Sequence, residues 1–230
     1  MGLGYFTPKE ILENKDLIKD ALLNESSYFI RSGILGSLLV KNIPHESQIL
    51  EIGSGGGQFG KFLLDRGYKN LTLSDIDDYI MPEVKARTSF FMADISFTKL
   101  PLHDSLIDLV LAITIFEHLE NPFFAIQEIT RVLRKNGKLI IAIPYIFSLR
   151  SKFKFFLRGD LSGYTETNNH VSLFTRALFK KVFLKHYIIK ETYYSPGFIK
   201  VLGKKIKFPL FLGFLNKYFG NDVMYILEKK

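Results

Sequence analysis

The stretch that decides the fold of this chain lies between Ile49 and Gly60 and reads ILEIGSGGGQFG. Four residues of strand character lead into a glycine-rich turn, and the start of a helix follows the turn. Glycine lets the backbone turn sharply and lets a ligand approach the main chain without meeting a Cβ atom. Free N–H groups at the start of the helix can bind a carboxylate or a phosphate. The stretch therefore predicts a ligand-binding turn at the end of a buried strand.

Taken alone, this turn leaves two alternatives open. Gly55, Gly57 and Gly60 have the G-x-G-x-x-G spacing of dinucleotide-binding folds. A tight turn that binds nothing is the other alternative. The sequence on either side has to distinguish them.

Short apolar runs of strand length alternate with helical or turn material on both sides of the turn. This β-α-β-α alternation predicts a parallel sheet with helices on both faces. The runs are Gln48–Ile52, Leu71–Ser74, Ser89–Met92, Ile107–Ile113 and Lys138–Ile143, and Tyr187–Tyr194 and Val223–Leu227 have the composition of a closing pair of strands.

Helices are predicted before and after these strands. A capping box at residues 7–10 predicts a helix to about Leu23, and a second helix with apolar residues at helical spacing continues to Leu39. A later helix is expected from about Thr175 to Lys185. The segment 145–169 between the last core strand and this helix is aromatic and basic, and it lacks clean periodicity.

One helix inside the core has clear signals at both ends. Asn121 has the residue type of an N-cap, and Pro122 fits the first helical position. Basic residues up to Lys135 favour the C-terminal end of the helix, and Asn136-Gly137 predicts the stop.

The composition of the 230 residues excludes several classes of protein. The absence of cysteine excludes disulfides, thiolate metal sites and cysteine nucleophiles, and we expect no metal site. The chain does not open with a basic segment followed by an apolar stretch, and no apolar run approaches the roughly 18 residues that span a bilayer. We therefore expect a cytoplasmic protein.

Charge is unevenly distributed along the chain. Residues 1–144 contain 15 Lys/Arg and 18 Asp/Glu, whereas residues 145–230 contain 16 and 5, so the two parts carry −3 and +11. An excess of this size favours an anionic partner, and a solvated basic face is the alternative. Nucleic acid is not expected as a partner, because the chain contains no recognised nucleic-acid-binding motif.

Two carboxylates follow the second and third predicted strands. Asp75 comes directly after the second strand, where an acidic side chain can accept hydrogen bonds from both ribose hydroxyls of an adenosine-type ligand. Asp77 and Asp78 are alternatives further from the strand. Asp94 closes the third strand and is suited to accept from an adenine amino group, while Ile95 packs on the ring.

The order of the motifs between Ile49 and Pro144 carries a family resemblance. After the turn and the two carboxylates come LPL at 100–102, IDLV at 107–110, EHL at 117–119, ExxRVL at 128–133 and, further on, HVSLFT at 170–175. In this order the motifs closely resemble the class I S-adenosylmethionine (SAM)-dependent methyltransferases of the ubiquinone, menaquinone and small-molecule group. Ile107 and Asn136 depart from the family pattern, which has Phe and Gly there.

The resemblance implies an α/β, Rossmann-like sheet of seven strands in the order 3-2-1-4-5-7-6, with the last strand antiparallel, helices on both faces and an N-terminal helical cap. It implies a single methyltransferase domain over residues 1–230. This domain would comprise a helical cap at 1–45, a SAM-binding core at 46–144, and an acceptor-side insertion with closing strands at 145–230. SAM, the implied cofactor, would lie across the carboxyl ends of strands 1, 2 and 4.

The resemblance also implies the residues of the cofactor site. Glu51 is expected to hydrogen-bond to the backbone of the glycine turn rather than to act chemically. Arg31 and Tyr28 are expected to close over the methionine end of SAM, with ordinary packing in the cap as the alternative. The remaining positions are Gly53, Ser54, Gly55 and Gly57 at the methionine moiety, Asp75 and Ile76 at the ribose, Asp94 and Ile95 at the adenine, and Ala112 and Ile113 beside the sulfonium.

The catalytic candidates are two histidines. Methyl transfer from a sulfonium is an in-line displacement, for which the protein mainly aligns the acceptor and excludes water. A neutral hydroxyl acceptor also needs a general base, and histidine suits that role near pH 7. His118 follows the fourth strand, and His170 opens the helix after the insertion. Roles in orienting a loop and in packing a helix are the alternatives.

The acceptor is expected to be a small molecule methylated on oxygen or carbon, with nitrogen as a further option. Phenylalanines among lysines and arginines at 145–163 and 200–219 favour a quinone-like, lipid or lipid-linked glycan acceptor and peripheral contact with the inner face of an anionic membrane. The chain is expected to be a monomer or homodimer. The alternatives are a non-catalytic SAM-fold protein that binds a membrane or partner through its basic C-terminal part, and an NAD-dependent oxidoreductase.

Overall fold

The computed structural model describes residues 35–36, 38–39, 43–166, 168–195, 198–201, 204–207 and 214–230. The helix predicted over residues 7–23, most of the second predicted helix, and Arg31 and Tyr28 lie outside these residues. Leu35 and Leu39, one helical turn apart, are fully buried. The apolar spacing at the end of the second predicted helix therefore faces the core.

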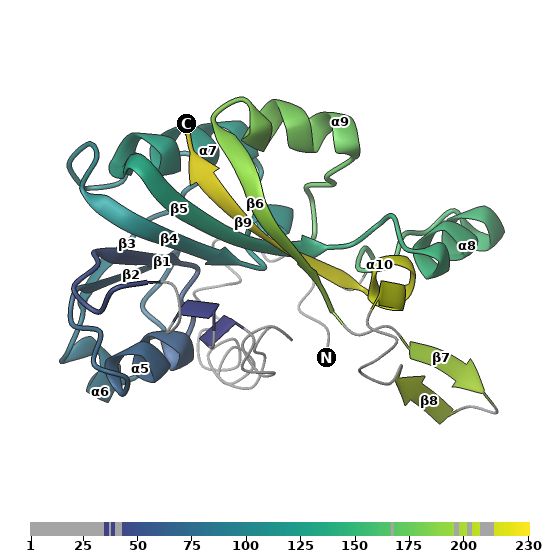
Figure 1. The fold of residues 1–230 in the computed structure, drawn as a ribbon, viewed down its shortest axis with the longest axis horizontal. Coiled ribbons are helices and arrows are strands. Elements are labelled where there is room, and N and C mark those ends of the chain that lie inside the picture. The colour runs from purple at the N-terminus through teal and green to yellow at the C-terminus, as the bar shows by residue number, and fades with distance from the viewer. Residues whose placement is uncertain are drawn as a thin grey trace.

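A seven-stranded sheet forms the centre of the molecule, in the order β3-β2-β1-β4-β5-β9-β6 (Figure 1). The strands from β3 to β5 are parallel neighbours, and β9 runs antiparallel to both β5 and β6. This confirms the predicted order and the antiparallel last strand. The strands are β1 (Ile49–Ile52), β2 (Leu71–Asp75), β3 (Ser89–Met92), β4 (Ile107–Ile113), β5 (Leu133–Pro144), β6 (Tyr187–Tyr194) and β9 (Asp222–Lys229).

Apolar side chains on the two faces of the sheet form two separate clusters. Successive residues of a strand point to opposite faces, so Leu50 and Ile52 join one cluster and Ile49 joins the other. Figure 1 shows α7 and α9 on one side of the sheet and α5 and α6 on the other. These helices are α5 (Gln58–Leu64), α6 (Pro82–Lys85), α7 (Pro122–Val132) and α9 (Arg176–Phe179), which continues as a π-helical turn, η2 (Lys180–Leu184).

Helix α7 begins as predicted but ends early. The Asn121 side chain accepts a hydrogen bond from the N–H of Phe124 at 3.1 Å, which confirms the predicted N-cap. The helix ends at Val132 instead of Lys135, because Leu133 already pairs with β4 as the first residue of β5. Pairing with a neighbouring strand outweighs the weak local helix preference of the basic residues.

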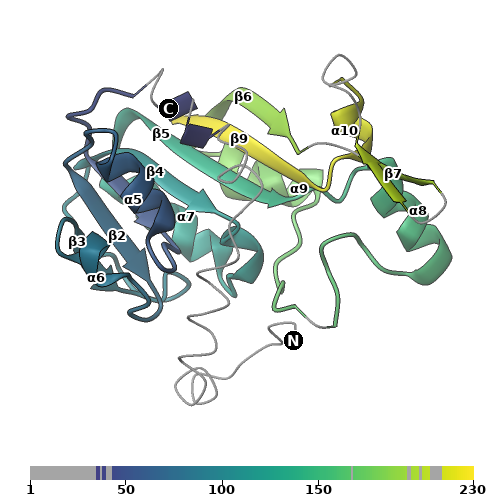
Figure 2. The same ribbon diagram turned by 90° about the horizontal axis from the view of Figure 1, so that it is seen from below.

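The segment after β5 departs most from the prediction. Residues 145–169, expected to be irregular, contain helix α8 (Leu149–Arg158). The hairpin β7–β8 (Phe198–Val201 and Lys204–Lys207) and helix α10 (Asn216–Phe219) lie close to α8 at one end of the sheet (Figures 1 and 2). Within the described part of the chain, no helix has the length and apolar character needed to cross a bilayer.

Candidate functional site

The glycine turn leaves the carboxyl end of β1 and is held against β2. The N–H groups of Gly53 and Ser54 both donate to the Ser74 carbonyl, at 2.8 and 3.1 Å. Gly53 has a φ of 70°, and a Cβ atom there would lie 1.8 Å from Cδ1 of Ile115. Gly57, the N-cap of α5, has a φ of 79°. These left-handed conformations explain why the turn uses glycine at both positions.

Asp75 ties the end of β2 to this turn. Its two carboxylate oxygens accept hydrogen bonds from the N–H groups of Gly55 and Ile76, each at 2.7 Å. Each carboxylate oxygen offers more than one lone pair, so the side chain can also accept from two hydroxyl groups of a ligand. The structure thus brings Asp75 and Ile76 against the glycine turn, where the sequence analysis expected the ribose.

The other predicted cofactor positions lie along the same edge of the sheet. The pairing of β2 with β3 places Asp94 and the buried Ile95 beside Asp75. The register between β1 and β4 places Ala112 and Ile113 on the other side of the turn. All of these residues meet where parallel strands end, which is where open α/β sheets bind their ligands.

Glu51 lies in β1, two residues before the first glycine of the turn. Its side chain is buried and hydrogen-bonds to the backbone of Gly60 at the start of α5. Burial, followed by the negative charge of Asp75, raises the pKa of Glu51 to about 8. The carboxyl is therefore mostly neutral at pH 7 and contacts the backbone at the start of α5, and the structural role expected for Glu51 stays a prediction.

His118 and His170 lie side by side although they are distant in the sequence. Their ring centroids are 4.6 Å apart, and the ring planes are nearly perpendicular, at 86°. His118 ends a short 3-10 helix, η1 (Phe116–His118), after β4, and His170 lies in the loop before α9. Two N–H groups of that loop donate to the Glu117 carbonyl, at 2.8 and 2.9 Å, which fastens the loop to η1.

Burial sets the ionisation of this group of side chains. It lowers the pKa of His118 to about 4, with the charge of His170 as the second cause, and it also lowers the pKa of His170. Burial raises the pKa of Glu117 to about 8. A general base works best with a pKa near the operating pH, so His118 is a weaker base than its predicted role requires. The general-base role of either histidine stays a prediction.

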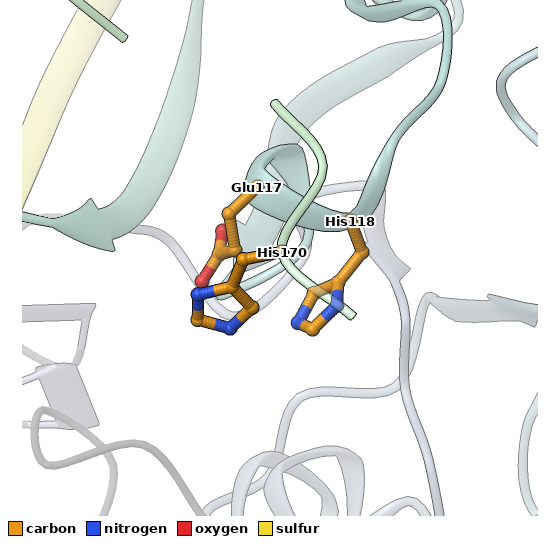
Figure 3. A group of neighbouring side chains, drawn as sticks. All are labelled: Glu117, His118 and His170. Carbon is orange, nitrogen blue, oxygen red and sulfur yellow. The ribbon is translucent and has the colours of Figure 1, made fainter. Parts of the chain in front are cut away.

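Glu117 is the member of this group that the sequence analysis missed. Its side chain is 1% exposed, and Figure 3 shows its carboxylate pointing into the same space as the two imidazole rings. The signal was present in the EHL motif, because Glu117 follows the buried Phe116 shortly after the strand β4. An acidic residue in such surroundings is buried at a cost unless it has a partner.

Residues 50–141 match the family model described as Methyltransferase domain. The matched segment begins in β1 and ends in β5, so it includes the glycine turn, both carboxylates and η1. This segment is a methyltransferase domain. The order of the sheet confirms the predicted fold, and the match of this segment to the family model confirms the predicted family resemblance and, with it, SAM as the cofactor of the domain.

The methyltransferase domain is similar to archaeal proteins. A segment of 108 residues is 34% identical to an uncharacterised protein of Methanocaldococcus jannaschii, and the match covers 46% of each chain, less than half of that relative. A SAM-dependent methyltransferase of Archaeoglobus fulgidus shares the fold with a TM-score of 0.58 and 17% identity, over 89% of this chain and all of its own. A SAM-dependent methyltransferase of Methanosarcina mazei also shares the fold, with a TM-score of 0.54 and 16% identity, over 84% of this chain and 96% of its own.

The affinity of the methyltransferase domain for SAM is expected to fall as the pH drops from 7 to 5. Burial is the main cause that raises the pKa of Asp75 to about 6. The negative charge of Asp77 acts in the same direction, and the N–H groups of Gly55 and Ile76 oppose it. The Asp75 carboxylate, which is expected to accept from the ribose, is therefore mostly present above pH 6 and mostly lost below it. At pH 5 about one molecule in ten keeps the carboxylate, so binding should weaken about tenfold.

Isothermal titration calorimetry with SAM at pH 5, 6 and 7 measures this profile. Two further ionisable side chains interact with Asp75, namely Glu51 from β1 and Tyr79 from the loop before α6, and burial raises the pKa of both. The Asp75→Asn variant serves as the control, because it should bind weakly with little dependence on pH. A wild-type affinity that stays constant over this range would exclude Asp75 as the titrating group.

Proposed function

We propose that this chain transfers the methyl group of SAM to an oxygen or carbon atom of a lipid-like acceptor at an anionic membrane surface. The methyltransferase domain supports the first half of this proposal, and the exposed face of helix α8 carries the second. The acceptor would approach along the edge of the sheet at which the strands from β1 to β5 end.

The residues around the glycine turn suit SAM. Asp75, which already accepts from the N–H of Gly55 in the turn, can also accept from the ribose hydroxyls. The Ser54 hydroxyl is buried in the same turn and has no hydrogen-bond partner within the described residues. A buried polar atom without a partner is costly, so a polar group of the ligand is a fitting partner for this hydroxyl.

The reaction depends mainly on the alignment of the acceptor atom with the methyl group of SAM. An acceptor oxygen or carbon attacks the methyl carbon, the new bond forms as the methyl–sulfur bond breaks, and the electron pair of that bond goes to sulfur. The products are the methylated acceptor and neutral S-adenosylhomocysteine, and a hydroxyl acceptor also releases its proton. Because the reactive methyl group belongs to SAM, the protein contributes by positioning the acceptor and excluding water.

Helix α8 exposes its apolar face to solvent. Leu149, Phe153, Phe156 and Leu157 follow the spacing of one helical stripe, and their exposed fractions are 48%, 66%, 82% and 60%. The opposite face is the one that packs, since Ser151 is fully buried and its hydroxyl accepts from a backbone N–H of the following loop at 3.0 Å. A water-soluble helix normally buries its apolar stripe, so this arrangement points to an apolar environment outside the chain.

Charge favours a membrane as that environment. Arg150 and Lys152 flank the apolar stripe of α8, and residues 145–230 carry a net charge of +11. A helix with aromatic and leucine side chains between basic residues suits the interface of an anionic bilayer. Because α8 follows the carboxyl end of β5, docking there would bring the acceptor side of the domain to the lipid.

Radiolabelled methyl transfer tests the proposed function. The purified full chain is incubated with SAM that carries a labelled methyl group and with vesicles of a total lipid extract rich in phosphatidylglycerol. We expect label in the organic-solvent extract and an equal amount of S-adenosylhomocysteine. Label confined to water-soluble products would refute the lipid-like acceptor. SAM binding without any product would favour the non-catalytic alternative.

The double variant Phe153→Ser/Phe156→Ser tests the role of α8 in the same experiment. Burial of each Phe contributes about 1.5–3 kcal/mol, so vesicle binding measured by co-sedimentation should fall at least tenfold. SAM affinity should be unchanged. The matched control is Leu106→Ser, which removes an exposed apolar side chain just before β4, at the opposite edge of the sheet. Equal co-sedimentation of wild type and both variants would show that α8 does not dock.

A further inference from the structure

Three side chains capable of binding a metal ion converge beside the glycine turn. Glu117, His118 and His170 each offer one ligand atom, and these atoms all lie within 4.8 Å of one another. In Figure 3 the three side chains point into one space from two chain segments, η1 and the loop before α9. Their position follows from the fold, because η1 comes directly after Ile115, whose side chain lies against Gly53.

Each of these three side chains also carries a polar atom that lacks a partner. Oε2 of Glu117, Nδ1 of His118 and Nδ1 of His170 are buried and have no hydrogen-bond partner in the described part of the chain. Three buried unsatisfied polar atoms in one cluster would together cost several kilocalories per mole in an apolar protein interior without a ligand. A cation that accepts a lone pair from each of them removes that cost.

A polar group of the chain lies near the remaining nitrogen of each imidazole. His118 hydrogen-bonds to Asn169, and His170 hydrogen-bonds to the backbone of Gly163. Because Nδ1 is the unpartnered atom in both rings, these bonds use the other ring nitrogen. A metal-binding histidine usually donates from its second nitrogen in this way, which fixes the tautomer and turns the lone pair toward the ion.

We propose that Glu117, His118 and His170 bind a divalent transition-metal ion at the acceptor side of the methyltransferase domain. Two imidazoles and one carboxylate are the protein ligands of many catalytic zinc and non-haem iron sites, and such a set suits these ions better than Mg²⁺ or Ca²⁺. This proposal departs from the sequence analysis, which expected no metal site because the chain lacks cysteine. Nitrogen and oxygen ligands suffice.

Three protein ligands leave a coordination position open for an oxygen atom. The role of the ion rests on the proposed function: an acceptor hydroxyl bound at that position would lose its proton more easily, because the metal stabilises the oxyanion. The proton would pass to solvent, and the oxyanion would attack the methyl carbon of SAM while the electron pair of the methyl–sulfur bond goes to sulfur. The ion would thereby take over the activation that the sequence analysis assigned to a histidine base.

Metal binding is measured on the full chain without a histidine tag and without SAM. The protein is treated with a chelator, dialysed and titrated with Zn²⁺ by calorimetry, and with Co²⁺ by visible absorption. We expect one ion per chain and the intense Co²⁺ bands of a four- or five-coordinate site. Absence of Zn²⁺ binding, or a Co²⁺ spectrum that stays that of the hydrated ion, would overturn the proposal without the use of any variant.

Conservative variants test which side chains bind the ion. Glu117→Gln and His170→Gln keep side-chain volume and should each weaken Zn²⁺ binding at least tenfold, while circular dichroism and SAM affinity stay as in wild type. The matched control is His103→Gln, an exposed histidine in the loop before β4. Wild-type Zn²⁺ affinity in both cluster variants, or an equal loss in the control, would overturn the assignment.

The two proposals fail in distinguishable ways. A chain that binds Zn²⁺ at this cluster but shows no methyl transfer keeps the metal site and loses the proposed function. A chain that transfers methyl groups equally well after chelation, and binds no Zn²⁺ or Co²⁺, keeps the proposed function and loses the metal site.

Discussion

Replacement of Asp75 by alanine is expected to weaken SAM binding about a hundredfold. The variant loses the carboxylate that would accept from both ribose hydroxyls, and a hydrogen bond to a charged group contributes about 1.5–3 kcal/mol. Two such bonds correspond to about 3 kcal/mol or more, which is a hundredfold in affinity. The Gly55 N–H also loses its partner at 2.7 Å, so the glycine turn is held less firmly.

Isothermal titration calorimetry with SAM checks this result. The matched control is Asp65→Ala, which removes an exposed aspartate that pairs with Lys61 and Arg87 at the far end of α5. SAM affinity should be unchanged in the control. The Asp75→Asn variant should bind SAM more tightly than Asp75→Ala, because its side-chain oxygen can still accept. If Asp75→Ala binds SAM as wild type does, the cofactor site has been placed wrongly.

Replacement of Arg131 by alanine is expected to lower the free energy of unfolding by about 3 kcal/mol. Arg131 donates to both carboxylate oxygens of Glu128 and to the carbonyl oxygens of Leu100 and Leu102, at distances from 2.7 to 3.2 Å. The side chains of Arg131 and Glu128 are 18% and 11% exposed. Removal of the guanidinium leaves the carbonyls of Leu100 and Leu102 without this donor. It also leaves a largely buried carboxylate that keeps the hydrogen bond from the Leu100 N–H but loses its ion pair, and breaking a buried pair costs about 3–5 kcal/mol.

Thermal unfolding checks this expectation, because 3 kcal/mol corresponds to a fall in Tm of about 6–12 °C for a chain of this size. Arg87→Ala is the matched control, since its ion pair with Asp65 is half exposed on both sides. Exposed pairs contribute about 0–1 kcal/mol, so the control should unfold close to the wild-type temperature. Equal Tm values for the two variants would show that the Arg131 network does not stabilise the loop before β4.

The core of the fold could be predicted because its signals are local. The strands from β1 to β4 are short, largely apolar runs, and Gly53 follows β1 while Asp75 closes β2. The alternation of strands and helices predicts a parallel sheet, and the order of the strands was predicted from the family resemblance. Asp75 and Asp94 were found for the same reason, since a residue that follows a parallel strand always lies at the carboxyl edge of the sheet.

Helix α8 was not predicted, because its residues do not show the clear apolar periodicity by which a helix is found in a sequence. Leu149, Phe153 and Phe156 have helical spacing, but the phenylalanines and basic residues between them blur the periodicity. Sequence reasoning also assumes that an apolar stripe faces the core. In α8 the stripe faces solvent and Ser151 faces the protein. Only the position of the helix relative to the rest of the chain reveals this.

The sequence by itself determined the glycine turn, the parallel core of the sheet and the family resemblance that implied its strand order, because these depend on motifs made of residues that are neighbours along the chain. Tertiary structure alone decided which distant side chains meet. It placed His170 beside Glu117 and His118, and it turned Arg131 from the end of a helix onto the loop before β4. Contacts of this kind depend on how two distant segments pack against each other, and no local pattern of residues encodes that packing.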